Sequence, residues 1–253
     1  MHQALGSRAS AQDKLSQAQD HFLRGLALCQ ELGSRSGIAH CQLFLANTLE
    51  AHEKFDEAIQ IYADASTTID ELGDKAYYKA WLTDGMGTLD YSLGNFDAAI
   101  NKLSIALDMY RSNHRSATIR TLNNRGRSWL ALNAFEKAEA DYLEALNLAL
   151  LTNDPIYGVF IIESVLGLAN LKGKTGSLIY AVSLLALVSI MTKDFEVIRF
   201  ANRFLEELRP LLMPEKFDAA FEWGKALGLD KVVTDLLANP IFPVNAHIGG
   251  ASE

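Results

Sequence analysis

Apolar residues recur three and four positions apart through most of the chain, as at Phe55, Ala58, Ile59 and Tyr62. This spacing places the apolar side chains on one face of an α-helix. Alternating β-branched runs bounded by Asn-Gly or Asp-Gly, which would indicate strands, are absent from the sequence. The pattern therefore predicts an all-α protein made of amphipathic helices, each about 15 to 20 residues long.

Turn residues divide this pattern into separate helices. Gly33, Gly73 and Gly94 each follow an apolar run, where a glycine commonly ends a helix. Asp154-Pro155 places an N-cap residue before a proline at the first helical position. The run from Leu178 to Met191 is apolar almost throughout but shorter than the ~20 residues that span a bilayer. We expect it to be a helix buried between its neighbours.

Three segments, 54–59, 95–100 and 134–139, align on a shared alanine. These motif alanines are Ala58, Ala99 and Ala138, with Ala18 and Ala181 as weaker members of the series. A nearly constant spacing of about 40 residues, with two helices in each unit, is typical of a helical solenoid.

The repeat resembles the tetratricopeptide repeat, in which a small residue lets the two helices of a hairpin cross closely. The pattern small, aromatic, small at Ala138, Tyr142 and Ala145 carries the resemblance, although the period is longer than the usual ~34 residues. It implies a right-handed superhelix of about five helical hairpins over residues 1–193, the first incomplete. C-terminal capping helices are expected over 194–238, with a flexible tail over 239–253.

This longer variant also resembles the repeat region that ends large ATP-dependent bacterial regulators of the LuxR and MalT kind. The resemblance is carried by segments 163–171, 176–187 and 217–227 and by the junctions at 71–74 and 151–154. It implies a role in signal transduction or transcription regulation. The sequence contains no Gly-x-x-x-x-Gly-Lys-Ser/Thr phosphate loop, so ATP hydrolysis and DNA reading would belong to other segments or proteins.

The net charge and the cysteine content limit the kinds of partner that the protein is expected to bind. The 253 residues carry a net charge of −8, which argues against direct nucleic-acid binding. Cys29 and Cys41 lack the paired spacing of a zinc site, and two cysteines do not make a disulfide scaffold. A cytoplasmic protein without a signal peptide or membrane anchor is the simplest expectation.

Sequence motifs for catalysis are weak. The six histidines form no metal-binding pattern, and Gly85-x-Gly87 lies inside a helical pattern with no strand before it. Lys172–Gly176 resembles a phosphate loop only superficially. We therefore expect no enzyme, no cofactor and no metal, and no cluster of titratable groups with shifted pKa values in a closed pocket.

The inner face of the first helix of each hairpin is unusually polar for helices otherwise built of leucine and alanine. In tetratricopeptide repeats the corresponding positions contact peptides, and asparagine and arginine can pair with backbone amides and carboxylates. The resemblance makes these the candidate groove residues: Asn47, Glu50, Trp81, Asp84, Thr88, Tyr91, Arg120, Asn123, Arg127, Glu163 and Asn170.

The sequence thus predicts a non-catalytic module that binds a protein, a peptide or a small effector in this groove. Arg120, Asn123 and Arg127 would supply the donors for an acidic or C-terminal peptide segment. An ordinary solvated groove, an enzyme that uses the polar groove residues, and a purely structural adaptor stay open as alternatives.

Overall fold

The computed structural model describes residues 15–73, 75–110, 114–151 and 158–242. These residues form twelve α-helices and one short 3-10 helix, and contain no strand. The all-α solenoid predicted from the sequence is confirmed, while the right-handed sense of its superhelix stays a prediction.

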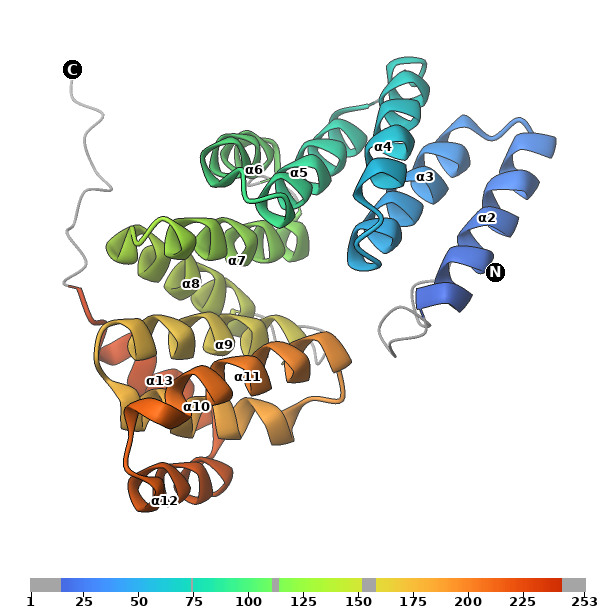
Figure 1. The fold of residues 1–253 in the computed structure, drawn as a ribbon. Helices are drawn as coiled ribbons and strands as arrows, with labels where there is room; N and C mark the ends of the chain where they lie inside the picture. Colours follow the sequence, from blue (N-terminus) through green and yellow to red (C-terminus); the bar gives the residue numbers. More distant parts are fainter. Residues whose placement is uncertain (1–14, 74, 111–113, 152–157, 243–253) are drawn as a thin grey trace, which may run out of the picture.

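Four helical hairpins follow one another along the chain, preceded by the single helix α2 (Leu15–Glu31). Successive helices pack against each other, and the first helices of neighbouring hairpins are also in contact. Figure 1 shows the stack running from α2 at one end to the C-terminal helices at the other. The hairpins are α3 (Arg35–Ala51) with α4 (Phe55–Asp70), α5 (Ala76–Ser92) with α6 (Phe96–Tyr110), α7 (Arg115–Ala131) with α8 (Phe135–Leu150), and α9 (Gly158–Lys174) with α10 (Leu178–Met191).

The five motif alanines lie on α2, α4, α6, α8 and α10, and none of them has any exposed surface. A methyl group at these positions lets a neighbouring helix approach closely. The register predicted from the sequence therefore places each alanine at a helix crossing.

The turn inside each hairpin contains one residue with left-handed backbone geometry, five positions before the motif alanine. Gly94 and Gly176 take this position with φ of 81° and 94°, whereas Glu53 and Asn133 take it with φ of 60° and 57°. Because glycine adopts this region without steric cost, two of the four turns use the residue that suits them best.

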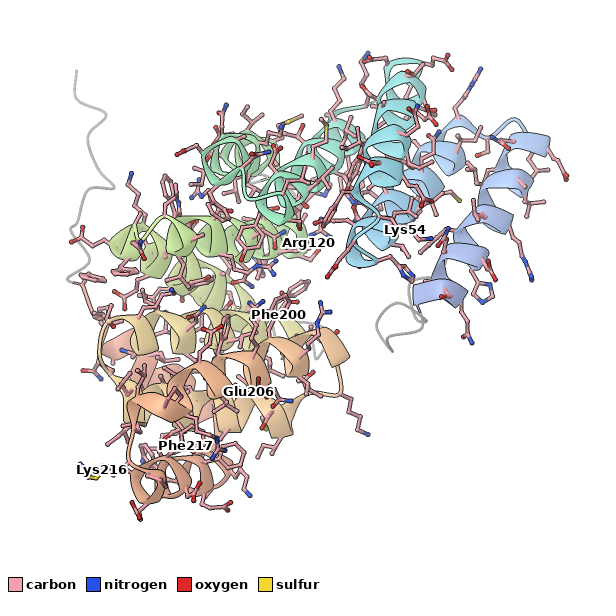
Figure 2. All side chains as sticks on the ribbon, viewed as in Figure 1. Lys54, Arg120, Phe200, Glu206, Lys216 and Phe217 are labelled. Carbon is pink, nitrogen blue, oxygen red and sulfur yellow. The ribbon has the colours of Figure 1, made fainter. Side chains whose placement is uncertain are left out.

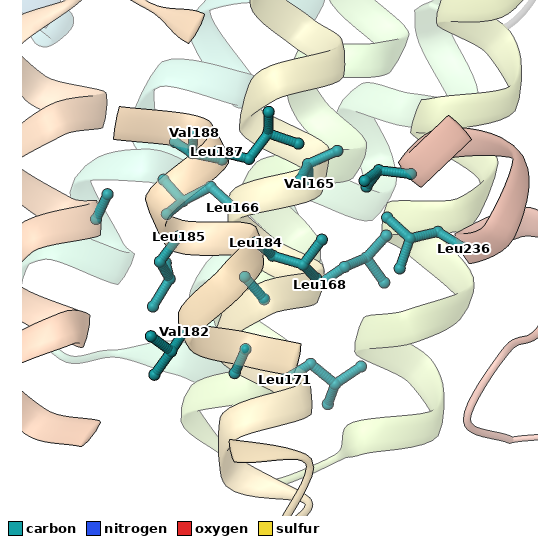
Figure 3. Packing of buried hydrophobic residues seen from close by; sticks show 14 of the residues in the cluster. Val165, Leu166, Leu168, Leu171, Val182, Leu184, Leu185, Leu187, Val188 and Leu236 are labelled. Atoms are coloured by element: carbon teal, nitrogen blue, oxygen red, sulfur yellow. The ribbon is translucent and has the colours of Figure 1, made fainter. Parts of the chain in front are cut away.

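The C-terminal helices α11 (Phe195–Leu208), α12 (Pro214–Lys225) and α13 (Leu229–Ala238) close the end of the stack, with the 3-10 helix Arg209–Leu211 between the first two. Helix α10 packs against α9, α11 and α12, and its residues from Ala181 to Val188 are all buried. The expectation of a buried rather than membrane-spanning helix is confirmed for α10. Figure 3 shows its side chains meeting those of α9, and Leu236 of α13 belongs to the same apolar cluster. No helix in the described ranges is long and apolar enough to cross a bilayer.

The chain continues past α13 onto the surface of α8. The buried carboxylate of Glu139 accepts hydrogen bonds from the backbone N–H groups of Ile241 and Phe242, at 2.6 and 2.8 Å. We call residues 239–242 the C-terminal strap. The sequence assigned them to a flexible tail, whereas the structure places them against the repeats; residues 243–253 lie outside the described part of the chain.

Candidate functional site

The inner surface of the solenoid contains two adjoining cavities of about 680 and 470 Å³. Six residues line both cavities and join them into one feature, which we call the groove. They are Tyr91, Arg120, Arg127, Glu163, Phe200 and Arg203.

Ten of the eleven candidate residues line this groove. Asn47, Glu50, Asp84 and Thr88 face the smaller cavity, Asn123 and Asn170 face the larger one, and the remaining four face both. Their convergence follows from the repeat, because equivalent positions on stacked first helices lie on the same face of the solenoid.

Trp81 is the exception. Its side chain is only 4% exposed and packs edge-on against Phe44 and His40, with ring centroids 4.8 and 5.1 Å away. The large indole gains more by being buried between α3 and α5 than by lining an open surface. Trp81 therefore does not line the groove, unlike the other ten candidate residues.

Hydrogen bonds connect the groove side chains from one hairpin to the next. Ser92 on α5 donates to Glu50 on α3 at 2.8 Å, and Ser164 on α9 donates to Asn123 on α7 at 2.9 Å. Between α5 and α7, Asn124 donates to Thr88 at 3.2 Å. These polar side chains therefore help to hold the inner faces of the first helices together, in addition to lining the groove.

Asp84 is the strongest of these links. It is 3% exposed and accepts hydrogen bonds from Arg120 Nη2 at 2.8 Å and Thr121 Oγ1 at 2.7 Å. An almost fully buried carboxylate requires such partners, because burial of an unpaired charge is very unfavourable. Part of the donor capacity that the sequence assigned to a ligand is thus used by Arg120 inside the protein.

Arg127 occupies the middle of the groove. It donates to Asn124 Oδ1 on its own helix, and its guanidinium lies 5.7 Å from the centre of the Tyr91 ring. Its positive charge also acts on Glu50 of α3 and Glu163 of α9. Groups on α3, α5 and α9 therefore interact with this one side chain of α7.

Two groove carboxyls hold their protons more tightly than usual. Burial raises the pKa of Glu50 to about 7, against the opposing effects of the Ser92 hydroxyl and of Arg127. Burial also raises the pKa of Glu163. From the sequence we expected no titratable groups with shifted pKa values in a closed pocket; the structure contains these two carboxyls in a groove that is open to solvent.

Helix α11 forms the opposite wall of the groove, and none of its residues was among the candidates predicted from the sequence. Phe200 and Arg203 line both cavities, and Phe204 lines the larger one. Figure 2 shows Phe200 on the side of α11 that faces Arg120 of α7.

A signal for this wall was present in the sequence. Residues 216–220 at the start of α12 repeat the pattern of residues 95–99, and Ala220 follows Ala181 by nearly one period. Ala220 is only 3% exposed, like the motif alanines. If α12 corresponds to the second helix of another hairpin, then α11 corresponds to its first helix. In agreement with this, α11 packs against α9 and α10 of the preceding hairpin.

The described residues contain no group of three or more histidine, cysteine, aspartate or glutamate side chains placed to hold a metal ion. The groove instead combines guanidinium, carboxyl, amide and aromatic groups, which bind ligands by hydrogen bonds, ion pairs and stacking.

No family model and no curated protein matches the sequence. Among solved structures, the chain is similar to BtubC (BKLC) from P. vanneervenii, with a TM-score of 0.59 at 15% identity, over 94% of this chain and 98% of that one. A structure of the TPR2AB domain of yeast Sti1 in complex with pHSP90 aligns over 88% of this chain and 97% of that one, at 12% identity and a TM-score of 0.37. The similarity to BtubC concerns the fold alone, and it agrees with the stack of helical hairpins.

Proposed function

We propose that the chain is a non-catalytic interaction module that binds an extended peptide segment of a partner protein in the groove. The observation that carries the proposal is the convergence of ten predicted side chains from α3, α5, α7 and α9 on one groove, with α11 as its second wall. In a variant of this proposal, the ligand is a small effector molecule that binds in the larger cavity.

The side chains favour a ligand with both acidic and apolar groups. Arg127 supplies a guanidinium for a carboxylate, while Tyr91 and Phe200 supply aromatic surface beside it. Because burial raises the pKa of Glu50 to about 7, the negative charge of this side chain is reduced near neutral pH, and an acidic ligand meets less repulsion there.

Peptide binding tests the proposal directly. We expect fluorescently labelled octapeptides with Glu and Phe side chains to bind the wild-type chain, measured by anisotropy, and the Arg127→Ala variant to bind them about tenfold more weakly. Arg35→Ala is the matched control, because Arg35 is exposed and pairs with Glu71 on the surface outside the groove. Helical content measured by circular dichroism should be unchanged in both variants.

Equal binding by the wild type, Arg127→Ala and Phe200→Ala would place the site outside the groove. The absence of binding to any acidic, neutral or basic octapeptide would remove the peptide-binding proposal and favour a structural adaptor.

Catalysis in the groove is the second candidate function, and the raised pKa values of Glu50 and Glu163 are the observation that favours it. Turnover of ester, glycoside or phosphate substrates, abolished in Glu50→Gln or Glu163→Gln, would support this function over the first. Thermal-shift screening against sugars and nucleotides tests the small-effector variant.

A role in signalling or transcription control in the cytoplasm completes the proposal, and it rests on the resemblance to the LuxR and MalT kind of regulator. The coding sequence around this chain tests it. An ATPase in the same reading frame would support the kinship, and an unrelated neighbouring domain would oppose it.

A further inference from the structure

The carboxylate of Glu139 recognises the C-terminal strap through the main chain. Its Oε1 atom accepts a hydrogen bond from the backbone N–H of Ile241 at 2.6 Å, and its Oε2 atom accepts one from that of Phe242 at 2.8 Å. Pro240, the residue before them, has no N–H group to offer. Because every residue except proline carries a backbone N–H, another extended segment can make the same pair of bonds.

A small apolar contact accompanies these two bonds. The side chain of Ile241 packs against the apolar cluster to which α8, α9, α10 and α13 contribute. Ile241 and Phe242 are both only partly buried. A segment of another protein with a similar apolar residue after a proline would therefore make the same contacts.

The packing of the repeats does not require a carboxylate at this place. Glu139 directly follows the motif alanine of α8 and is 3% exposed. None of the equivalent residues on α2, α4, α6 and α10 is acidic: they are Gln19, Ile59, Ile100 and Val182. An isoleucine or valine would fill the space without the unfavourable burial of a charge. The carboxylate is therefore explained by the N–H pair that it binds.

Lys172 on α9 provides a positive partner for the carboxylate when the strap is absent. The lysine is 8% exposed, and its Nζ atom lies 5.7 Å from the centre of the Tyr180 ring. Its charge interacts with that of Glu139. Because the lysine side chain rotates about several bonds, its ammonium group can pair with Glu139 once the N–H groups have left. A strap that only anchored the chain would not require this second partner.

Neither Glu139 nor Lys172 lines a cavity of the groove. We propose that they form the centre of a second binding site, which takes an extended apolar segment of a partner protein by two consecutive backbone N–H groups. The strap is the internal ligand of this site and occupies it until a partner segment replaces it. The ligand carries a proline followed by two apolar residues, as the strap does. The proposal is independent of peptide binding in the groove.

Peptide binding to the full chain tests the site. The probe is the labelled pentapeptide Ala-Asn-Pro-Ile-Phe, the sequence of residues 238–242, acetylated and amidated at its ends. In the Ile241→Pro/Phe242→Pro variant the strap has no N–H groups to donate. We expect fluorescence anisotropy to show that this variant binds the probe about tenfold more tightly than the wild type, in which the tethered strap competes at a local concentration on the order of millimolar. Equal affinities would overturn the proposal.

Two further comparisons locate the probe. In the proline variant, Glu139→Gln should weaken probe binding about fivefold, because it removes the charge and one acceptor. Glu136→Gln, at an exposed position on the same helix, is the matched control and should have no effect. A probe with N-methyl groups on both Ile and Phe has no donors at these residues and should not bind. Equal effects of the two glutamine substitutions, or equal binding of the methylated probe, would show that Glu139 does not hold the probe by its main chain.

Hydrogen exchange in the wild type tests the replacement of the strap without any substitution, so the result does not depend on the folding of the proline variant. The amides of Ile241 and Phe242 should exchange slowly in the free protein and about fivefold faster with the probe at millimolar concentration, because the probe takes their acceptor. NMR measures the two rates. Faster exchange supports the proposal, whereas unchanged exchange would show a fixed anchor and overturn it.

Melting temperatures test the part assigned to Lys172. Lys172→Met should increase the loss of stability that the Ile241→Pro/Phe242→Pro substitutions cause, because the carboxylate of Glu139 then has neither the N–H groups nor the lysine as a partner. The same loss with and without Lys172→Met would overturn the role of Lys172 in the open site.

Discussion

At the scale of single residues, the repeat requires the same backbone conformation from different residue types. The left-handed turn position is glycine in two hairpins, glutamate in one and asparagine in another. For a residue with a Cβ atom this conformation costs about 1 to 2 kcal/mol, and asparagine tolerates it better than glutamate. Glu53 therefore lowers the stability of the turn between α3 and α4.

Glu53→Gly should raise the free energy of unfolding by about 0.5 to 1 kcal/mol, after the greater freedom of glycine in the unfolded chain is subtracted. Asn133→Gly, the matched control in the α7–α8 turn, should give a smaller gain. Gly94→Ala should lower stability although its Cβ would meet no atom within 4 Å. Urea denaturation measures all three, and a loss in Glu53→Gly would contradict the argument.

At the motif alanines the volume of the side chain is restricted, whereas the backbone conformation is an ordinary helical one. Ala99 has no exposed surface, so Ala99→Leu should overpack the crossing of α5 and α6 by about 1 to 3 kcal/mol and lower the melting temperature. Ala98→Leu is the matched control, because Ala98 is exposed on the same turn. Equal melting temperatures for the two variants would count against the repeat register.

At the scale of elements, the C-terminal segments act on the repeats over long sequence distances. Helix α11 returns to line the groove, and the C-terminal strap lies against α8 through Glu139. The negative charge of this buried carboxylate also acts on Lys172, although burial is the main effect and lowers the pKa of that lysine. The strap therefore anchors the end of the cap to the middle of the solenoid.

Glu139→Ala should lower the free energy of unfolding by about 1 to 3 kcal/mol, because it removes the acceptor of two backbone N–H groups. In a chain that ends at Ala238 the same substitution should cost less, since the N–H groups of Ile241 and Phe242 are gone. A double-mutant cycle of urea midpoints measures the coupling. Full additivity would show that the strap does not depend on Glu139.

At the scale of the whole molecule, the groove concentrates charges that the folded protein must tolerate. Glu50 has a pKa of about 7 in the folded state against 4.5 for the free side chain. The folded protein thus binds a proton that the unfolded chain releases between these values. As the pH rises from about 4.5 to 7, ionisation of Glu50 makes the folded state progressively less stable, and the effect is complete above pH 7.

Glu50→Gln should therefore stabilise the protein at pH 8 by on the order of 1 to 3 kcal/mol and leave it nearly unchanged at pH 4, because Gln mimics the protonated acid. Glu31→Gln, at an exposed position at the end of α2, is the control and should show no such difference between the two pH values. Melting temperatures across this pH range measure the effect. A gain that is larger at pH 4 than at pH 8 would have the wrong sign and would refute it.

The helices, the period of about 40 residues and the positions of the candidate groove residues could be predicted from the amino-acid sequence. These properties depend on local spacing: apolar residues on one helix face, small residues at crossings, and equal positions in successive units. Ten of eleven candidate residues consequently line the groove.

The contacts that those residues make could not be predicted from the sequence and became visible in the three-dimensional structure. Asp84 accepts hydrogen bonds from Arg120 and Thr121 one repeat away, and Trp81 is buried in the core. Tyr142 has no hydrogen-bond partner among the described residues, whereas Tyr62 donates to Asn47. The physical reason is that hydrogen bonds and burial depend on the angles and separations of helices distant in sequence, which the period of the apolar pattern does not specify. For the same reason, the sequence did not predict that α11 lines the groove or that the C-terminal strap contacts Glu139. Both contacts join segments that are not related by the repeat spacing.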